Sequence, residues 1–388
     1  MPSYHRLGKL PSKRHTVFRR PDGGLHHEEL MGNQGFTGPS SLLYHLHPPT
    51  AVRRAGPLQP QPWQKADDGA LRPRHLRTSL LPPGGNAVTG RHPLLYNREV
   101  AILTARPTET AEFFYRNGQG DELIFVSDGE GVLESPFGRI PYGKGDYLII
   151  PRGITHRLRL GQGEQRYLMV ESRGVLQTPR RYRGAHGQHL EWSPFTERDF
   201  RLPQDLETID QTGEFEVQVK QHNGISRFFY ATHPFDVVGW DGYYYPWAFN
   251  IRDFEPIVGR VHQPPPVHQV FEGEGFVVCN FVPRLYDFHP EAVPVPYHHS
   301  NAQSDEVIYY ASERFMSRKG IEYGSITLHP DGIPHGPHPG TVEASLGQKQ
   351  TEELAVMIDS FRPLTVSREA ERIEDPTYLR SWLGEERS

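Results

Sequence analysis

Three residues in the last third of the chain could bind one metal ion. His299 and Glu306 lie in the segment YHHSNAQSDE, and His335 ends the segment GSITLHPDGIPH. Two histidines and a carboxylate from neighbouring strands can bind one face of a divalent ion and leave the other face open. Non-haem Fe(II) oxygenases favour this arrangement, while hydrolytic zinc sites use the same ligand types. The residues alone therefore predict a metal site without choosing the metal.

The spacing of these residues suits strands joined by turns. Alternate residues of a strand share a face, so His299 and Asn301 point together and a turn returns Glu306 beside them on the next strand. His335 follows a Gly-Ile-Pro turn, and Pro334 stiffens its approach. We therefore expect His299, Glu306 and His335 to meet, with Asn301 close by.

Other side chains compete with these three or support them. His298 points to the opposite face from His299 unless a bulge intervenes. Asp305 is out of phase with Glu306, although a slip of one residue would exchange them. His329 and His338 flank the third ligand and could orient ligands or substrate. The alternative for the whole set is solvated histidines in a chain that contains 21 of them.

The segment that carries the three residues has an earlier counterpart in the chain. Tyr115 and Glu122 match His299 and Glu306 at an offset of 184 (299 − 115), and an aspartate precedes both glutamates. His156 likewise matches His335 at an offset of 179 (335 − 156). Two copies of one β unit are the simplest explanation. The first copy has tyrosine where the second has a histidine, so only the second keeps the full ligand set.

Short apolar strands separated by turns dominate the chain from Glu99 onward. Examples are Val100–Thr104, Glu122–Val126, Asp146–Ile150, Phe215–Val219 and Ile326–Leu328. Strands at this spacing predict an all-β protein, an antiparallel sandwich or barrel. Helix is expected only near the C-terminus, where Asp375 can cap a short terminal helix with Pro376 at its first position.

The texture of the chain suggests three parts. Residues 1–95 are rich in Pro, Gly and His and predict an irregular N-terminal arm packed on the core. Residues 96–200 form the first β half, with the degenerate metal site. Residues 201–388 form the second half, which carries the complete site.

Composition limits the partners. A net charge of −5 and a pI near 6.5 show no basic excess for nucleic acid or an anionic membrane. No apolar run reaches the roughly 18 residues of a membrane span, and the N-terminus lacks an apolar signal core. The single cysteine, Cys279, lies in an apolar run and is expected to be inert. We expect a cytoplasmic protein with a small-molecule partner.

The two segments resemble the paired motifs of the cupin superfamily. The first is similar to His-x-His-x4-Glu with Asn301 in place of the second histidine, and the second matches Gly-x5-Pro-x-Gly-x2-His from Gly324 to His335. The resemblance implies a duplicated cupin (bicupin) built as an antiparallel β-sandwich or jelly roll.

Over most of its length the chain also resembles the homogentisate 1,2-dioxygenase family. The similarity is carried by SLLYH at Ser41, PFDVVGWDGY at Pro234, PYHHSN at Pro296 and PHGP at Pro334. It implies one Fe(II) per subunit and a homo-oligomer, a hexamer or a trimer. It also implies a reaction that inserts both atoms of O2 into homogentisate and yields maleylacetoacetate, a step of tyrosine and phenylalanine breakdown.

The resemblance assigns the same metal ligands and adds two candidate catalytic residues. Motif by motif, the iron ligands of the family fall on His299, Glu306 and His335. Tyr297 matches a tyrosine beside the first ligand and is expected in the substrate pocket. The family signature has a substrate-binding histidine where this chain has Asp241, so Asp241 is predicted to face the substrate. A turn aspartate that caps backbone amides is the equal alternative for this residue.

Three functions remain open from the sequence. The first is the Fe(II)-dependent ring-cleaving dioxygenase, acting on homogentisate or on a related hydroxylated aromatic acid. The second is a metal-dependent cupin isomerase or hydrolase that uses no O2. The third is a non-enzymatic cupin that binds a small aromatic acid.

Overall fold

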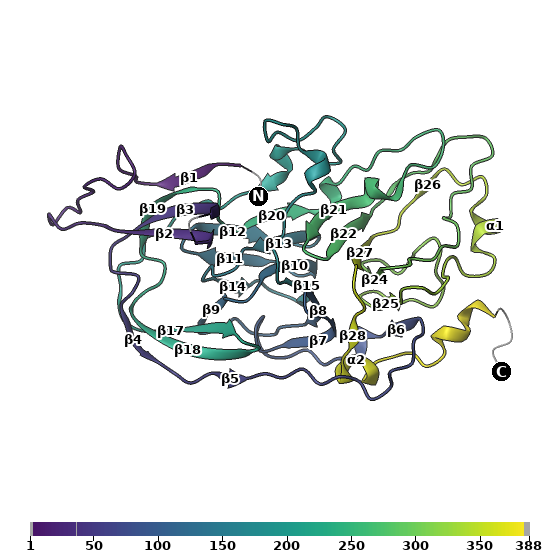
Figure 1. Ribbon diagram of the computed structural model, residues 1–388, viewed down its shortest axis with the longest axis horizontal. Coiled ribbons are helices and arrows are strands. Elements are labelled where there is room, and N and C mark those ends of the chain that lie inside the picture. The colour runs from purple at the N-terminus through teal and green to yellow at the C-terminus, as the bar shows by residue number, and fades with distance from the viewer. Residues whose placement is uncertain (1–2, 36, 384–388) are drawn as a thin grey trace.

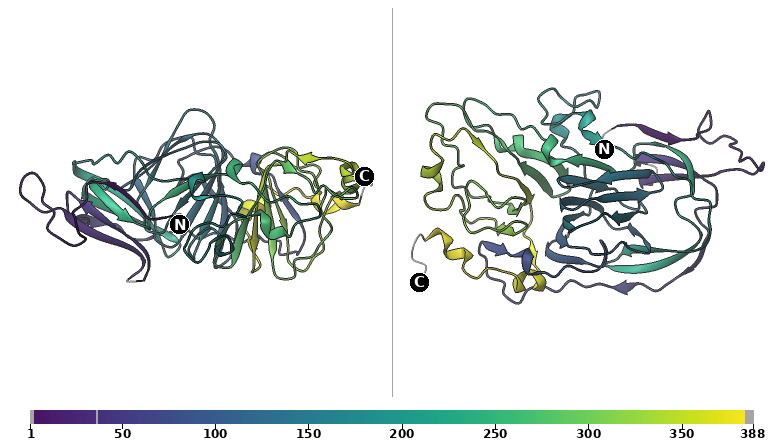
Figure 2. Two further views of the ribbon diagram at one scale, coloured as in Figure 1. Left: turned by 90° about the horizontal axis from the view of Figure 1, so that it is seen from above. Right: turned by 180° about the vertical axis from the view of Figure 1, so that it is seen from behind.

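Two β-sandwich halves lie end to end along the long axis of the molecule (Figures 1 and 2). The computed structural model describes residues 3–35 and 37–383. α-Helix among these residues is confined to α1 (Thr341–Ser345) and α2 (Arg368–Arg372). No helix in the described ranges is long and apolar enough to cross a membrane. The all-β, antiparallel fold predicted from the sequence is confirmed.

The first half is built around an eight-stranded sheet, with a three-stranded sheet packed beside it. The large sheet has the order β16-β20-β13-β10-β15-β8-β7-β28, and the small one has the order β12-β11-β14. The strands of the large sheet are β7 (Arg91–Tyr96), β8 (Val100–Ala105), β10 (Asp121–Asp128), β13 (Asp146–Ile150), β15 (Arg166–Ser172), β16 (Phe200–Arg201), β20 (Trp247–Asn250) and β28 (Thr365–Val366). Those of the small sheet are β11 (Gly131–Ser135), β12 (Gly138–Tyr142) and β14 (Arg157–Leu160).

Two further sheets lie at the end of the molecule away from the second half, on the left of Figure 1. One has the order β1-β19-β3-β2, and the other has the order β4-β18-β17-β9 with β5 also paired to β18. Their strands are β1 (His5–Gly8), β2 (His27–Gln34), β3 (Thr37–His45), β4 (Val52–Ala55), β5 (Gln59–Pro60), β9 (Phe114–Asn117), β17 (Thr212–Gln221), β18 (Gly224–Thr232) and β19 (Val237–Gly242). The N-terminal arm, expected to be irregular, thus contributes strands to these sheets, including the nine residues of β3.

The second half is built on a six-stranded sheet of order β21-β22-β27-β24-β25-β6 and a two-stranded sheet, β23-β26. Its strands are β6 (Arg74–Leu76), β21 (Gln269–Gly273), β22 (Phe276–Phe281), β23 (Arg284–Leu285), β24 (Asp305–Tyr310), β25 (Ile326–His329), β26 (Gln350–Thr351) and β27 (Ala355–Ser360). The C-terminal segment ends in a 3₁₀ helix, Tyr378–Trp382, rather than an α-helix.

Strand pairing divides the chain near Asn250 and not between residues 200 and 201. β17 pairs in parallel with β9, and β20 pairs with β13 through Asp146 and Asn250, so residues 201–250 belong to sheets of the first half. The chain also crosses between halves at two edges: β6 pairs with β25, and β28 pairs with β7. The amino-acid pattern shows where strands are but not which strands they pair with, so the expected boundary fell inside the short strand β16 of the first half.

The repeated segments fold alike. Tyr115 and His156 form a two-residue antiparallel bridge, and His299 and His335 form the same bridge in the second half. The turn before each distal segment needs a left-handed residue, which Gly145 (φ 90°) and Gly324 (φ 78°) supply without steric cost. The duplication inferred from the sequence offsets therefore extends to the backbone.

Aromatic side chains join the two halves. Phe125 lies edge-on to Tyr309, and Tyr147 lies edge-on to Phe271, at centroid distances of 6.0 and 5.1 Å. The Tyr147 hydroxyl also donates to Asn280 Oδ1 at 2.6 Å. These contacts belong to one buried apolar core shared by both halves, which fixes the second half against the first.

Candidate metal centre

The structure brings His299, Glu306 and His335 together. One ligand atom from each lies within 4.8 Å of the others, and each histidine Nε2 lies 3.5 Å from Glu306 Oε2. Glu306 is the second residue of β24, while the histidines come from the bridge that closes this end of the sheet. The His299 and His335 rings lie edge to face, 4.3 Å apart, so their nitrogens converge on one point beside the carboxylate.

Backbone carbonyls orient both imidazole rings. His335 Nδ1 lies 3.1 Å from the carbonyl oxygen of Ile333, and His299 Nδ1 lies 3.4 Å from that of Tyr297. A proton on Nδ1 satisfies each of these contacts and leaves the Nε2 lone pair free for a metal.

Glu306 is held as a carboxylate. Burial alone would raise its pKa, but His299, His329 and His335 outweigh burial and lower the pKa of Glu306 well below its usual range. His329 Nδ1 lies 2.8 Å from Oε1, and its ring stacks on that of His335. Burial lowers the pKa of His329 to about 4, so this ring is neutral and donates one hydrogen bond to the glutamate.

These residues fit a divalent metal ion. His335 is buried, and its Nε2 has no hydrogen-bond partner among the described residues, although a buried ring nitrogen is costly to leave unpaired. Two imidazole nitrogens and one carboxylate oxygen are a donor set that iron and zinc accept. An ion between the three groups would give His335 Nε2 a partner and would also neutralise the carboxylate of Glu306.

His299 and Glu306 line a cavity of about 380 Å³, and His335 lies beside them in the cluster. Its walls are mostly apolar, and this volume lies within the range of small-molecule sites. The apolar lining includes Ile257, Val258, Val267, Phe281, Ile308, Phe315 and Met357. The cavity can therefore hold a flat organic molecule against the candidate metal ligands.

Comparisons with known proteins identify the family. The model of the homogentisate 1,2-dioxygenase N-terminal region matches residues 85–251. A protein of Saccharolobus solfataricus named "Putative dioxygenase" is 43% identical over 382 residues, which cover 98% of each chain. The chain belongs to the homogentisate dioxygenase family. The homogentisate 1,2-dioxygenase of Rhodopseudomonas palustris is 27% identical over 98% of this chain and 91% of its own.

Solved cupin structures share much less sequence identity with this chain. A cupin 2 conserved barrel domain protein from Leptotrichia buccalis is 10% identical, with a TM-score of 0.35 over 76% of this chain and all of its own. An oxalate decarboxylase from Bacillus subtilis is 11% identical, with a TM-score of 0.33 over 78% of this chain and 80% of its own.

The competing residues predicted near the ligands take other places. Asp305 accepts backbone N–H groups of Asp331 and Leu364 at 2.8 and 2.6 Å and is absent from the cluster. His298 is exposed and packs over Gly336, outside the three-residue cluster. The three-residue cluster therefore contains Glu306 and His299 and not their chain neighbours.

The predicted supporting residues divide between the cavity and the C-terminal helix. Asn301 lines the cavity, and its backbone carbonyl accepts from Gly332 N–H at 2.8 Å. His338 Nδ1 accepts the Lys319 N–H at 2.8 Å, and its ring packs on Trp382, so it braces the C-terminal segment. His329 contacts the candidate ligand Glu306.

Asp241 lies away from the cavity, contrary to the expectation that it faces the substrate. It is a buried residue of β19 that accepts hydrogen bonds from the Tyr4 hydroxyl at 2.9 Å and from Arg14 at 2.6 Å, and it does not line the cavity. Its physical role here is to fasten the N-terminal arm. Tyr297, by contrast, lies at the cavity and is 58% exposed as a whole residue.

Three cavity residues had no signal in the sequence. His262 lies beside Tyr297 with a ring distance of 5.5 Å, and its Nδ1 is 3.4 Å from Asp287 Oδ2. Asp359 stands opposite Glu306 on β27, and its Oδ1 has no hydrogen-bond partner within the described ranges. Arg318 is buried, 3.9 Å from Glu306 Oε1. None of them belongs to a spaced motif, because loops and another strand deliver them.

Burial and the charge of Glu306 raise the pKa of Asp359 to about 7. A carboxyl group with this pKa carries a proton part of the time near neutral pH, so it can either accept or donate a hydrogen bond inside the cavity.

Proposed function

We propose that this protein is an Fe(II)-dependent ring-cleaving dioxygenase whose favoured substrate is homogentisate. Both atoms of O2 enter the aromatic ring, which opens beside a hydroxyl group to give maleylacetoacetate. The observation that carries the proposal is the cluster of His299, Glu306 and His335, of which His299 and Glu306 line a mostly apolar cavity. The relatives named as homogentisate 1,2-dioxygenases supply the choice of substrate.

The metal, held by His299, Glu306 and His335, would bring the phenolate and O2 into contact and pass charge between them. His329 keeps Glu306 oriented through its 2.8 Å contact. Phe281, Phe315 and other apolar walls exclude water and hold the flat ring.

His262 is the residue we assign to proton transfer. Its imidazole lines the cavity, beside Tyr297, and Asp287 lies 3.4 Å from Nδ1. A carboxylate at that nitrogen orients the ring and leaves the other nitrogen to take a proton from a substrate hydroxyl. This assignment replaces the role that the family resemblance suggested for Asp241.

The test is an anaerobic reconstitution with Fe(II) followed by oxygen-electrode measurements with homogentisate. We expect one O2 consumed for each homogentisate, with both atoms of labelled O2 in the product. His335→Ala should lose both metal and turnover, whereas the matched His156→Ala, in the first half, should keep both. Turnover by metal-free protein, or turnover unchanged without O2, contradicts the proposal, and the latter result favours an isomerase or hydrolase.

A panel of hydroxylated aromatic acids tests the substrate separately from the reaction. If Fe(II)-loaded protein consumes O2 with another acid and not with homogentisate, the reaction type stands and the substrate changes. Binding of an aromatic acid without conversion in the Fe(II)-loaded protein would point to a binding cupin.

A further inference from the structure

The first half contains a second, fully buried version of the candidate metal centre. Glu122 occupies the position of Glu306, His156 that of His335 and Tyr115 that of His299. His156 Nδ1 lies 3.0 Å from the carbonyl oxygen of Ile154, as His335 Nδ1 lies 3.1 Å from that of Ile333. The backbone therefore orients the histidine in the same way in both halves.

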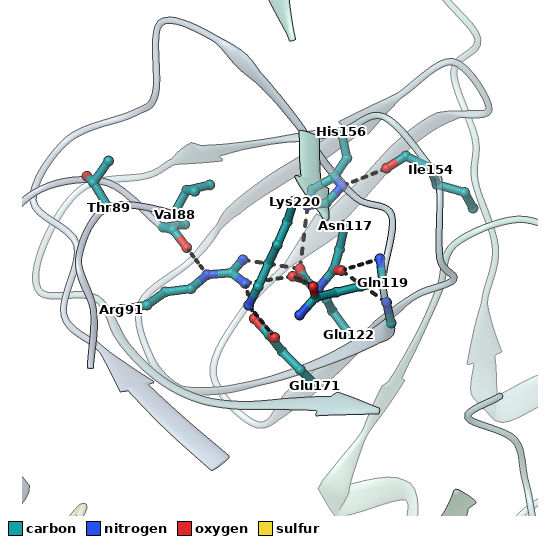
Figure 3. A network of polar contacts seen from close by, with 12 residues as sticks. Val88, Thr89, Arg91, Asn117, Gln119, Glu122, Ile154, His156, Glu171 and Lys220 are labelled. Atoms are coloured by element: carbon teal, nitrogen blue, oxygen red, sulfur yellow. Dashed lines mark hydrogen bonds and ion pairs between the residues drawn. The ribbon is translucent and has the colours of Figure 1, made fainter. Parts of the chain in front are cut away.

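A guanidinium group lies where those donors converge. Arg91 NH1 and NH2 donate to Glu122 Oε1 and Oε2 at 2.6 and 3.1 Å, and NH1 also donates to Glu171 at 3.0 Å. The Arg91 side chain is 8% exposed, and its charge lies 5.0 Å from the centre of the Tyr115 ring. Figure 3 shows Arg91 across the two carboxylates, with Lys220 beside it.

The carboxylates of the two halves correspond pair by pair. Glu171 stands opposite Glu122 on β15, as Asp359 stands opposite Glu306 on β27. Glu171 bonds both Arg91 and Lys220. Asp359 has an Oδ1 without a partner in the described part of the chain. In the first half Arg91 and Lys220 neutralise the pair of carboxylates. In the second half the corresponding pair, Glu306 and Asp359, lines the cavity.

Electrostatics agree with a bound cation in the first half. Burial alone would raise the pKa of Glu122, but the charge and hydrogen bonds of Arg91 outweigh burial and lower it to about 2. Burial lowers the pKa of His156, whose ring is therefore neutral, and its Nε2 lies 3.8 Å from Glu122 Oε2. Glu122 and His156 are thus in the protonation states that metal ligands require.

We propose that the guanidinium of Arg91 occupies the place of the metal ion in the first half and keeps a divalent ion out. This half is then a latent metal site that two changes reopen. Arg91→Ala removes the internal cation, and Tyr115→His restores the missing imidazole beside Glu122 and His156. Arg91 is anchored from outside the motif, through Nε–H donation to the Ala87 carbonyl, so its removal leaves the bridge of residues 115 and 156 in place.

The experiment measures Co(II) bound per chain after dialysis, in a His335→Ala background that disables the second half. The test variant is Arg91→Ala/Tyr115→His/His335→Ala, and the matched control is Tyr115→His/His335→Ala with Arg91 retained. We expect the test variant to gain one Co(II) per chain over the His335→Ala parent. Its melting temperature should rise on Co(II) addition, and the bound Co(II) should show ligand-field absorption in the visible region.

Each result decides for or against the proposal. A folded test variant that gains no Co(II) overturns it, and so does a control that gains as much Co(II) as the test variant. Folding of the test variant only in the presence of Co(II) supports it, whereas failure to fold with and without Co(II) overturns it. The readout needs no turnover, so an inactive wild-type protein would refute the proposed function and leave this inference standing.

Discussion

The two halves of this protein present nearly the same donors from the same backbone and differ in the cation that the donors meet. In the second half His299 and Glu306 line an open cavity, with His335 beside them. In the first half Glu122 pairs with the side chain of Arg91, and His156 lies beside Glu122. The comparison teaches that the β unit supplies geometry, whereas residues outside the motif decide which cation that geometry holds.

Access differs as well as charge. His299, the candidate ligand at the cavity, is 35% exposed in its side chain, whereas its counterpart Tyr115 is 2% exposed. A buried guanidinium with paired carboxylates excludes both water and substrate, so the first half is suited to stability. The second half keeps unpaired polar atoms, such as Asp359 Oδ1, where a ligand can reach them.

The largest expected difference between the halves is in turnover. His335→Ala should remove the metal and reduce O2 consumption to background, because one of three protein ligands is lost. His156→Ala should leave O2 consumption within about twofold of wild type, because His156 lies in the first half, away from the candidate metal ligands. Mutations at distant sites usually have effects of this size. Metal analysis and an oxygen electrode measure both. A matching loss in His156→Ala would break the comparison.

For the stability of the fold, by contrast, the first half should matter more. Arg91→Ala leaves the buried charge of Glu122 without its cation, while Glu171 keeps Lys220, and should lower the free energy of unfolding by about 3–5 kcal/mol. The control Arg54→Ala removes a half-exposed pair with Glu214 and should cost only about 0–1 kcal/mol. Urea unfolding followed by circular dichroism gives both values. Equal effects of the two variants would show that the buried network adds no special stability.

Acid should reveal the same network. The pKa of Glu122 falls from 4.5 to about 2 on folding, so its contribution is fully present above about pH 4.5 and is lost as pH falls toward 2. That contribution is on the order of 3 kcal/mol. Wild-type protein should lose this stability over that window, and Glu122→Gln, which cannot ionise, should lose less over the same range. Chemical denaturation at a series of pH values tests the prediction, and parallel pH curves would contradict it.

A smaller kinetic effect is expected from the opposing carboxylates. Asp359→Asn should raise the KM for the aromatic substrate about tenfold, because one charge-assisted hydrogen bond in the cavity is weakened. Glu171→Gln, the matched change in the first half, should leave KM unchanged and lower only the melting temperature. Steady-state kinetics on both variants decide whether the open carboxylate binds substrate; an unchanged KM in Asp359→Asn would exclude that role.

The smallest effect is expected for Asp241→Asn. The amide keeps an acceptor for Tyr4 and for Arg14, whose side chain is 57% exposed, so stability should change by less than about 1 kcal/mol. Turnover should match wild type. A large fall in kcat measured with intact folding would restore the catalytic role that the family resemblance suggested.

The candidate ligands could be picked out from the sequence because each lies in a short segment with a recognisable spacing. His299 and Glu306 share one segment, and His335 ends the other. Glu306 could not be separated from Asp305 by spacing alone, since strand register decides which carboxylate faces inward, and only the pairing with β25 and β27 sets that register. The duplication could be seen because its offsets of 184 and 179 are constant within each segment.

The other site residues could not be predicted because tertiary structure delivers them. Arg91 comes from β7, outside either repeated segment, and His262 comes from an irregular loop. For Asp241 the local Trp-Asp-Gly pattern gave no sign that Tyr4 and Arg14, more than two hundred residues earlier, would fold back onto it. Long-range pairing also moved residues 201–250 into sheets of the first half.

The exchange of edge strands couples the stability of one half to that of the other. β6, from the N-terminal arm, closes the edge of the sheet that carries Glu306, and β28, from the C-terminal segment, closes the edge of the sheet that carries Glu122. Cutting the gene near residue 250 would leave each fragment with an unpaired strand edge, a template for aggregation. The intact chain should unfold as one cooperative unit, so a ligand that occupies the open half also slows amide hydrogen exchange in the closed one.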